Sequence, residues 1–165
     1  MTNFYPVFLN LTGRRCVIIG GGQIATGKIS KLLDSGANIV VISPDVTEEI
    51  QNLSANGFTE LYLRKYQVGD IDGAFLVIAA TNDRAVNQQI FEDAEKSGVL
   101  LNAVDDMPHC SFIAPSVVER GSVTVAISTG GASPALARKL RETLENSGDL
   151  EWADGTNVLS KTRQL

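Results

Sequence analysis

Short apolar runs alternate with longer amphipathic segments along the first two thirds of the chain. The runs are rich in β-branched residues and have the length of strands, whereas the segments between them carry apolar residues at helical spacing. Strands are expected over residues 15–19, 38–43, 61–66, 74–80 and 99–104. Helices are expected over residues 24–35, 47–56 and 83–97. This alternation predicts an α/β fold, a Rossmann-like doubly wound parallel sheet with helices on both faces.

The ends of the expected helices carry typical start and stop residues. Thr47 is placed to cap the second helix, and Gly36, Gly57 and Gly98 follow the three helices, where glycine commonly ends a helix. Residues 74–80 form a continuous apolar run, which is typical of a central parallel strand buried on both faces.

The pattern changes after about Pro108. The elements expected beyond it are strands over residues 111–118 and 122–128, a turn over residues 119–121 and a helix over residues 133–146. Ser133 followed by Pro134 is a strong helix start, because serine caps the first turn and proline fits its first position.

The last expected helix carries Leu136, Leu140 and Leu144 along one face. Two strands and one helix bury too little surface for a core of their own. Residues 113–146 are therefore either packed on the preceding domain or shared with a second chain, and a small β/α dimerisation segment is favoured. The expected organisation is a Rossmann-like domain over residues 1–112, the dimerisation segment over 113–146 and a poorly ordered polar tail over 147–165.

Composition narrows the class of protein. Of the 165 residues, 44% are hydrophobic and 20% are charged, as in a globular domain with a small appendage. The net charge of −5 argues against a nucleic-acid surface, and no apolar run approaches the length of a membrane span. The first residues do not resemble a signal peptide, and two cysteines are too few for a disulfide framework. A reduced cytoplasmic protein without nucleic-acid or membrane partners is expected.

The turn after the first strand carries the pattern Gly20-x-Gly22-x-x-Ala25. Gly20 permits a tight turn, Gly22 lets the backbone approach a pyrophosphate, and Ala25 keeps the helix close to the sheet. The alternative is a glycine-rich turn that binds nothing. The position of the pattern between a strand and a helix favours dinucleotide binding.

The second expected strand ends at Ser43-Pro44-Asp45. Ligands of doubly wound sheets bind at the carboxyl ends of the strands, and a carboxylate at the tip of this strand usually binds the ribose. Here Ser43 occupies that place and Asp45 follows it, so a solvated loop aspartate explains Asp45 as well as a ribose ligand does. Because no Arg or Lys lies here to bind a 2′-phosphate, NAD is expected rather than NADP.

Polar residues also follow the fourth strand, at Thr81, Asn82 and Asp83. Short polar side chains at this place cap the next helix, which explains Asn82 or Asp83 without a ligand. The same groups would lie beside a bound dinucleotide, and the two interpretations are compatible.

Two adjacent carboxylates, Asp105 and Asp106, follow the fifth strand and are the best acid/base candidates of the chain. Successive residues of an extended strand point in opposite directions, so only one of them is expected to face the ligand. A carboxylate in a partly apolar crevice would have a raised pKa and could hold a proton. The alternative is that these residues simply form a turn.

His109 and Cys110 follow closely, but no metal site is expected. Adjacent ligands rarely reach one ion, and the sequence holds no second His/Cys pair. Cys16 and Cys110 are expected to be ordinary buried or loop thiols. The single histidine, without a Gly-x-Ser-x-Gly motif, does not support a hydrolytic triad.

A second glycine-rich loop, residues 128–134, precedes the last helix. Such a loop can receive an anion such as a substrate carboxylate, or it can be a tight connection whose glycines adopt positive φ. Arg138 and Arg141 lie on the last helix, and their side chains are expected to point either to a polyacidic ligand or to water.

Several segments in this order are similar to those of precorrin-2 dehydrogenases, the family of sirohaem synthesis that also forms the N-terminal part of sirohaem synthase. The segments that carry the resemblance are residues 5–9, 20–25, 79–83, 102–106, 111–115 and 125–134. The first glycine motif alone is generic, whereas Ser-Thr-Gly-Gly-x-Ser-Pro after a strand pair is specific. The resemblance covers roughly residues 4–145.

The resemblance implies NAD⁺-dependent oxidation of precorrin-2 to sirohydrochlorin by a homodimer. It implies that Asp105 is the catalytic proton acceptor, which bifunctional members also use to insert ferrous iron, so ferrochelatase activity is a further expectation. It places Gln23, Ile24, Pro44 and Asp45 at the cofactor. Together with Gly20, Gly22 and Ala25 of the glycine motif and with Thr81 and Asn82 at the end of the fourth strand, these are the residues expected to bind NAD. It places Ser128, which is phosphorylated in some members, near the substrate, and Gly130, Gly131 and Ser133 of the same glycine-rich loop are expected there with it.

Two features depart from the family pattern. Only about twenty polar residues follow the last helix, where longer members carry a helical domain that helps to enclose the substrate. Asp105-Asp106-Met107-Pro108 replaces the usual Asp-Pro. Two alternatives to the dehydrogenase are a non-catalytic NAD-sensing regulatory module and a small oxidoreductase acting on another substrate.

Overall fold

The computed structural model describes residues 4–148 and separates into two compact units. The first, here called the sheet unit, is residues 6–112, and the second, the hairpin unit, is Met1–Tyr5 with Ile113–Leu165. The expected polar tail lies outside the described residues from position 149 onward.

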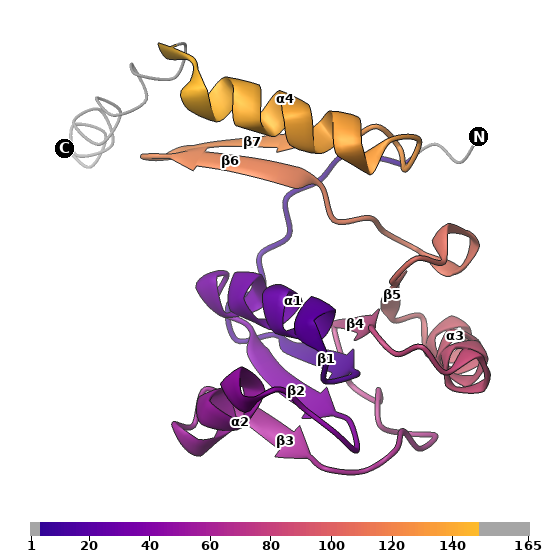
Figure 1. The fold of residues 1–165 in the computed structure, drawn as a ribbon. Helices are drawn as coiled ribbons and strands as arrows, with labels where there is room; N and C mark the ends of the chain where they lie inside the picture. The colour runs from indigo at the N-terminus through magenta and orange to yellow at the C-terminus, as the bar shows by residue number, and fades with distance from the viewer. Residues whose placement is uncertain (1–3, 149–165) are drawn as a thin grey trace, which may run out of the picture. The chain divides into compact units, whose positions relative to one another are not determined.

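The sheet unit holds a parallel five-stranded sheet in the order β3-β2-β1-β4-β5 (Figure 1). Its elements are β1 (Arg15–Ile19), α1 (Gln23–Asp34), β2 (Asn38–Ile42), α2 (Glu48–Ala55), β3 (Thr59–Tyr62), β4 (Leu76–Ala79), α3 (Arg84–Ser97), β5 (Leu100–Ala103) and a short 3₁₀ turn (Met107–His109). Ile18 of β1 lies opposite Val41 of β2 and Ile78 of β4. The predicted doubly wound α/β fold is confirmed.

Each face of the sheet has its own hydrophobic core. Cys16 and Ile18 of β1 point to the face covered by α1 and α2, where they pack with Ile29 and Ile50. Val17 and Ile19 point to the opposite face, which is covered by α3. Because successive strand residues alternate between the faces, the uninterrupted apolar run of β1 fills both cores.

The order of the strands reverses between β1 and β4. The chain runs from β1 outward to β2 and β3, then returns to place β4 on the other side of β1. Loops that leave the carboxyl ends of β1 and β4 therefore run to opposite faces and leave a crevice between them. This edge of the sheet is where a ligand site is expected.

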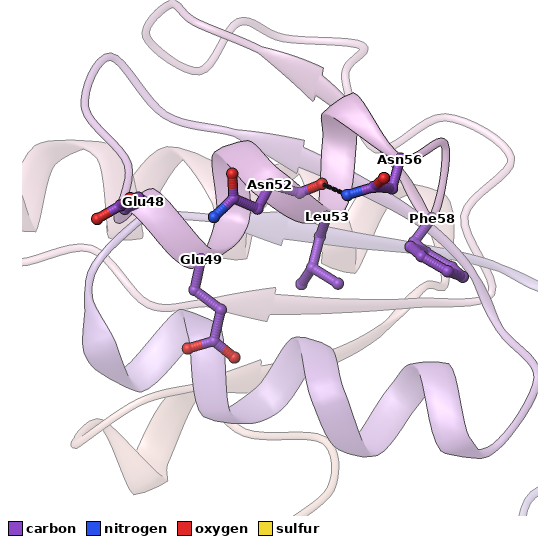
Figure 2. A pocket seen from close by; sticks show the side chains of 6 residues that line it. All are labelled: Glu48, Glu49, Asn52, Leu53, Asn56 and Phe58. Atoms are coloured by element: carbon purple, nitrogen blue, oxygen red, sulfur yellow. Dashed lines mark hydrogen bonds between the residues drawn. The ribbon is translucent and has the colours of Figure 1, made fainter.

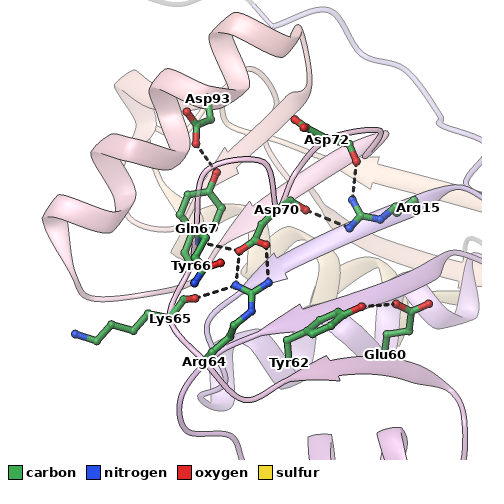
Figure 3. Close-up of polar contacts among 10 residues, drawn as sticks. All are labelled: Arg15, Glu60, Tyr62, Arg64, Lys65, Tyr66, Gln67, Asp70, Asp72 and Asp93. Carbon is green, nitrogen blue, oxygen red and sulfur yellow. Dashed lines mark hydrogen bonds and ion pairs between the residues drawn. The ribbon is translucent and has the colours of Figure 1, made fainter.

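The third strand is Thr59–Tyr62, whereas the sequence pattern predicted residues 61–66. Its partner β2 ends at Ile42, which lies opposite Tyr62, so the pairing of the two strands stops at Tyr62. The chain turns away instead. The Arg64 guanidinium forms two hydrogen bonds, of 2.8 and 2.7 Å, with the Asp70 carboxylate (Figure 3).

The hairpin unit consists of β6 (Ser116–Arg120), β7 (Val123–Ile127) and α4 (Pro134–Asn146). The two strands are antiparallel, and α4 packs against both of them, with Ala137 buried. None of the helices in the described part of the chain is long and apolar enough to cross a membrane.

Two expected boundaries in this region were wrong. The first strand begins at Ser116 instead of residue 111, because Ser111 is tied to β5: its backbone N–H donates to the Leu101 carbonyl at 2.8 Å. The turn lies at Gly121 and Ser122 instead of residues 119–121. Gly121 has a φ of +58°, which favours glycine at the first position of a two-residue hairpin turn.

Candidate functional site

The loop between β1 and α1 contains two glycines for which no other residue fits. Gly20 has a φ of +120°, and a Cβ at this position would lie 2.2 Å from the Ala80 carbonyl oxygen. A Cβ on Gly21 would lie 2.2 Å from the Asp45 carbonyl oxygen. The loops that follow β1, β2 and β4 can therefore meet only because these two positions lack side chains.

Gly22 differs from its two neighbours because nothing lies within 4 Å of the place where its Cβ would be. It is the N-cap of α1 and provides no side chain to the first turn. The first intrahelical bond runs from Thr26 N–H to Gly22 O, so the three preceding N–H groups of the helix have no helical partner. Open space next to free N–H donors and a positive helix end fits a phosphate group.

The glycine loop forms one wall of an open cleft of about 430 Å³. The lining residues are Gly20, Gly21, Gly22, Ser43, Pro44, Asp45, Val46, Thr47, Ala80 and Thr81. The structure thus brings together five of the residues expected at the cofactor: Gly20, Gly22, Pro44, Asp45 and Thr81.

The other four expected cofactor residues do not line this cleft. Gln23 and Ile24 directly follow Gly22 and are exposed at the start of α1, and Asn82 is exposed directly after Thr81. Ala25 is fully buried in the core between α1 and the sheet, the packing role given to it by the motif.

Val46, Thr47 and Ala80 also line the cleft, although their sequence pattern did not indicate a place there. Thr47 was expected only as the cap of α2, and it does accept a hydrogen bond from Ile50 N–H. Its hydroxyl also bonds the Thr26 hydroxyl at 2.9 Å, which ties the β2–α2 loop to α1. The run of three glycines was the one signal in the sequence for these residues. Gly21 lies against Asp45 and Val46, the residues directly before Thr47.

Asp45 lies in a loop with a fixed backbone and an exposed side chain. The Ser43 hydroxyl donates to the Asp45 carbonyl at 2.7 Å, and Thr47 N–H donates to the Gly21 carbonyl at 2.9 Å. The position at the edge of the cleft is compatible with either of the two interpretations of Asp45, as ribose ligand or as solvated residue.

The polar residues after β4 divide between capping and the cleft. Asp83 is the N-cap of α3 and accepts hydrogen bonds from Ala85 N–H at 3.0 Å and Val86 N–H at 3.3 Å, so the capping interpretation holds for it. Thr81 lines the cleft, and its carbonyl accepts a hydrogen bond of 3.0 Å from the Asn87 amide.

Asp105 follows β5 at the same edge of the sheet as the cleft loops, because all strands of the sheet are parallel. It has a φ of +60° and is the one non-glycine residue with positive φ in the described part of the chain. Its side chain is exposed and makes no hydrogen bond or ion pair within residues 4–148. The expected apolar crevice is therefore not formed around it by the sheet unit.

Asp106 is engaged elsewhere. Its carboxylate lies 2.6 Å from His109 Nδ1, and the His109 ring lies 4.3 Å from the ring of Phe91 on α3. Of the two adjacent carboxylates, Asp105 alone is free to act on a ligand.

The two cysteines are free thiols. Cys16 is fully buried, and this burial raises the pKa of its thiol to about 11. Cys110 is half-buried, and burial raises the pKa of its thiol as well. Within the described residues no group of three or more His, Cys, Asp or Glu side chains is arranged to hold a metal ion.

The second glycine-rich loop lies in the hairpin unit. Gly130 and Gly131 have φ values of +62° and +85°, and Gly130 N–H donates to the Ser128 hydroxyl at 3.1 Å. The Ser133 hydroxyl caps α4 by accepting from Leu136 N–H. The glycines are thus required by the turn itself, as expected for a tight connection. Of the two arginines on α4, Arg138 is exposed and Arg141 pairs with Glu145.

A second, smaller hollow of about 360 Å³ lies along α2 (Figure 2). Its lining residues are Glu48, Glu49, Asn52, Leu53, Asn56 and Phe58. It shares no residue with the cleft at the glycine loop and holds no loop from a carboxyl end of a strand, so it has no place in the candidate site.

Comparison with known proteins agrees with this geometry. Residues 7–116 match the family described as "Putative NAD(P)-binding", and residues 120–147 match the "Sirohaem biosynthesis protein central" family. The "Siroheme synthase" of Photorhabdus laumondii subsp. laumondii is 46% identical over 143 residues, which are 87% of this chain and 30% of that protein. That of Actinobacillus pleuropneumoniae serotype 3 is 43% identical over 143 residues, 87% of this chain and 29% of the relative. The chain thus spans less than a third of the length of these curated relatives.

A solved structure is similar over nearly the whole chain. "SirC, precorrin-2 dehydrogenase" superposes with a TM-score of 0.84 at 34% sequence identity, covering 97% of this chain and 79% of that one. The expected cofactor class is confirmed by the NAD(P)-binding family, whose match includes every loop of the cleft. From these matches, the chain belongs to the NAD(P)-binding, precorrin-2 dehydrogenase-like family of sirohaem biosynthesis.

Proposed function

We propose that this protein oxidises precorrin-2 to sirohydrochlorin with NAD⁺ as the oxidant. The observation that carries the proposal is the free, exposed carboxylate of Asp105 at the carboxyl end of β5, at the same edge of the sheet as the open glycine cleft. At this edge the glycine cleft offers a place for a dinucleotide. Asp105 offers a base whose carboxylate has no hydrogen-bond partner within the described residues. The similarity to SirC, a precorrin-2 dehydrogenase, supports the same conclusion.

The oxidation removes a hydride and a proton from the substrate, and the two go to different acceptors. The nicotinamide ring of bound NAD⁺ takes the hydride. In this proposal the Asp105 carboxylate takes the proton, as a positioned general base. The protein's further task is to hold the ring carbon of the tetrapyrrole between these two groups.

Three parts of the sheet unit would bind the dinucleotide. The free N–H groups at the start of α1, at Gln23 and Ile24, would bind the pyrophosphate above Gly22. Asp45 would accept hydrogen bonds from the adenosine ribose. The segment Ser43–Thr47 contains no Arg or Lys, so a 2′-phosphate would find no cation there, and NAD is favoured over NADP.

Precorrin-2 is a polycarboxylate, and the hairpin unit offers groups for carboxylates. Ser128 and Ser133 have hydroxyls in the loop before α4, and the positive φ values of Gly130 and Gly131 turn the backbone sharply between them. Such a turn at a helix N-terminus suits an anion. These four residues are proposed as a carboxylate-binding part of the substrate site.

A homodimer is also proposed. Leu136 and Leu140 of α4 are 51% and 44% exposed within the chain. They lie one turn apart and so form an exposed apolar patch on one face of the helix. Burying this face against a second copy would remove the apolar surface from water. The two free thiols suit a reducing compartment, which supports a cytoplasmic location.

The test is an anaerobic absorbance time course with freshly generated precorrin-2, NAD⁺ and the purified chain. The sirohydrochlorin spectrum is expected to grow in step with NADH, and Asp105→Ala is expected to slow this by at least about 100-fold while NAD⁺ binding is unchanged. Asp34→Asn, at the exposed far end of α1, is the matched control and should behave as wild type.

Each other outcome has a definite meaning. A flat wild-type trace with intact NAD⁺ binding would favour a nucleotide-sensing module over an enzyme. Full activity of Asp105→Ala would remove this carboxylate from the reaction. Adding ferrous ion after the oxidation, in the same cuvette, tests the separate proposal that the chain also inserts iron.

A further inference from the structure

The side chain of Cys110 closes the loop that carries Asp105 from both sides. The Cys110 thiol donates to the Ala103 carbonyl at 3.1 Å and lies 3.4 Å from the Asp106 carbonyl. These two carbonyls bracket Asp105 in the chain. The backbone on either side of the free carboxylate is therefore held to one sulfur atom.

The thiol itself is held in place from the sheet. Asn102 of β5 is 8% exposed, and its amide donates to the Phe112 carbonyl at 3.0 Å and to Cys110 Sγ at 3.7 Å. The sulfur thus accepts from the strand and donates to the loop. Burial raises the pKa of the Cys110 thiol, so it stays protonated and remains a donor at neutral pH.

The conformation that this arrangement fixes is an unfavourable one. Asp105 has a φ of +60°, a region that side-chain-bearing residues adopt rarely and only when their surroundings hold them there. The other bonds of the loop lie on the C-terminal side of Asp105 or are backbone bonds of ordinary turns. They are the contact of the Asp106 carboxylate with His109 Nδ1 at 2.6 Å and the backbone bonds Asp106 N–H to Ala103 O at 3.3 Å, His109 N–H to Asp106 O at 3.2 Å and Cys110 N–H to Met107 O at 3.1 Å. Without the thiol, the two carbonyls lose the donor that they share.

We propose that Cys110 is a positioning residue, which holds Asp105 in its left-handed conformation and so aims the carboxylate at the substrate. This inference rests on the proposed role of Asp105 as proton acceptor. It assigns no chemical step to the thiol, whose hydrogen bonds go to the two carbonyls and the Asn102 amide. Cys110 affects the reaction only by positioning the Asp105 carboxylate.

The first test compares kcat for three variants of the full chain. Cys110→Ala removes the donor and is expected to lower kcat between about 10-fold and 100-fold, because a base displaced by about an ångström transfers protons poorly. The KM for NAD⁺ should stay within about twofold, since Cys110 does not line the cleft. Cys110→Ser keeps a donor on the same Cβ and should recover most of the loss. Cys16→Ala, at the other thiol, should keep wild-type kcat.

A kcat of Cys110→Ala equal to that of wild type would overturn the proposal. So would a Cys110→Ser variant as slow as Cys110→Ala, because the sulfur would then act through its volume and not through its hydrogen bonds. Thermal unfolding of each variant, measured with and without NAD⁺, ensures that the rates compared are those of folded protein.

The second test combines Cys110→Ala with Asp105→Asn. If the cysteine acts only through Asp105, then adding Cys110→Ala to Asp105→Asn lowers the residual kcat by less than about twofold. The same fold-loss in both backgrounds would mean independent roles and would overturn the inference. Wild-type activity in Asp105→Asn alone would instead overturn the proposed function of Asp105, so the two failures are distinguishable.

Discussion

The Tyr66 hydroxyl donates a hydrogen bond of 2.7 Å to the carboxylate of Asp93, which is 5% exposed on α3 (Figure 3). This contact joins the irregular segment after β3 to the helix that covers the second face of the sheet. The Gln89 amide supplies the other carboxylate oxygen with a hydrogen bond of 3.1 Å. A buried carboxylate is costly unless its oxygens accept hydrogen bonds. The Tyr66–Asp93 pair therefore stabilises the fold and joins two segments that are far apart in the sequence.

Removing the Tyr66 hydroxyl is expected to lower the free energy of unfolding by about 2 kcal/mol, because Tyr66→Phe leaves one Asp93 oxygen without its donor. Tyr62→Phe is the matched control, since the Tyr62 hydroxyl makes only an exposed contact of 3.4 Å with Glu60. That variant should lose less than about 0.5 kcal/mol. Urea unfolding of the two variants measures the difference, and equal losses would contradict the prediction.

Stability is expected to fall in alkaline solution. Burial raises the pKa of the Cys16 thiol from 9.0 to about 11, and burial together with the bond to Asp93 raises the pKa of Tyr66. The fold therefore favours the protonated forms, so this stabilisation is complete below pH 9 and is lost progressively as the pH rises above it. At pH 11 the part of this loss that is due to Cys16 amounts to about 2 kcal/mol of the free energy of unfolding.

Denaturant unfolding between pH 8 and about pH 11 checks the alkaline prediction. Cys16→Ala should start from a lower stability, because it leaves a cavity, but its stability should depend less on pH than that of wild type. A pH dependence identical in the two proteins would show that the Cys16 thiol does not titrate with unfolding.

Two neighbouring glycines should respond in opposite ways to the same substitution. Gly22→Ala has room for its Cβ and should change stability by no more than about 0.5 kcal/mol, yet it should weaken NAD⁺ binding about 10-fold or more by occupying the space proposed for the pyrophosphate. Gly21→Ala must displace the backbone at Asp45 and should destabilise the fold itself. Calorimetric titration and thermal unfolding separate these effects. Unchanged NAD⁺ affinity in Gly22→Ala would place the phosphate elsewhere.

The exposed leucines of α4 provide a test of assembly. Leu136→Lys with Leu140→Lys is expected to convert a dimer into a monomer, because the two charges would be buried in the proposed interface. Lys139→Ala, on the same helix and also exposed, should leave the oligomeric state unchanged. Light scattering after size exclusion measures both. A wild-type chain that is monomeric at micromolar concentration would refute the dimer.

Most elements could be predicted because their signals are local. Thr47 and Ser133 are the caps of their helices as expected, because the capping bond spans only a few residues. The third strand was misplaced because its end depends on where its partner β2 stops, and Ile42 lies more than fifteen residues away in the chain. The first strand of the hairpin was misplaced for the same reason, since Ser111 is held by β5.

The candidate site divides in the same way. The glycine loop and the carboxylates after β5 could be recognised from motifs and from the rule that ligands bind at the carboxyl ends of strands. The distinction between Asp105 and Asp106 could not, because it depends on a contact with His109 and on a left-handed φ. The role of Thr47 in joining α1 to the β2–α2 loop also needed the structure, because its partner Thr26 lies on another helix.

The contact between Gly21 and the Asp45 carbonyl limits how the cofactor preference can be redesigned. An engineer who wishes this protein to accept a phosphorylated dinucleotide needs a cation beside the ribose. The backbone there is held by Gly21, Ser43 and Thr47, so insertions or a reshaped loop would disturb the wall of the cleft. Exchange of the exposed side chains of Pro44 and Asp45 leaves that wall intact, and these two positions are the ones at which to begin.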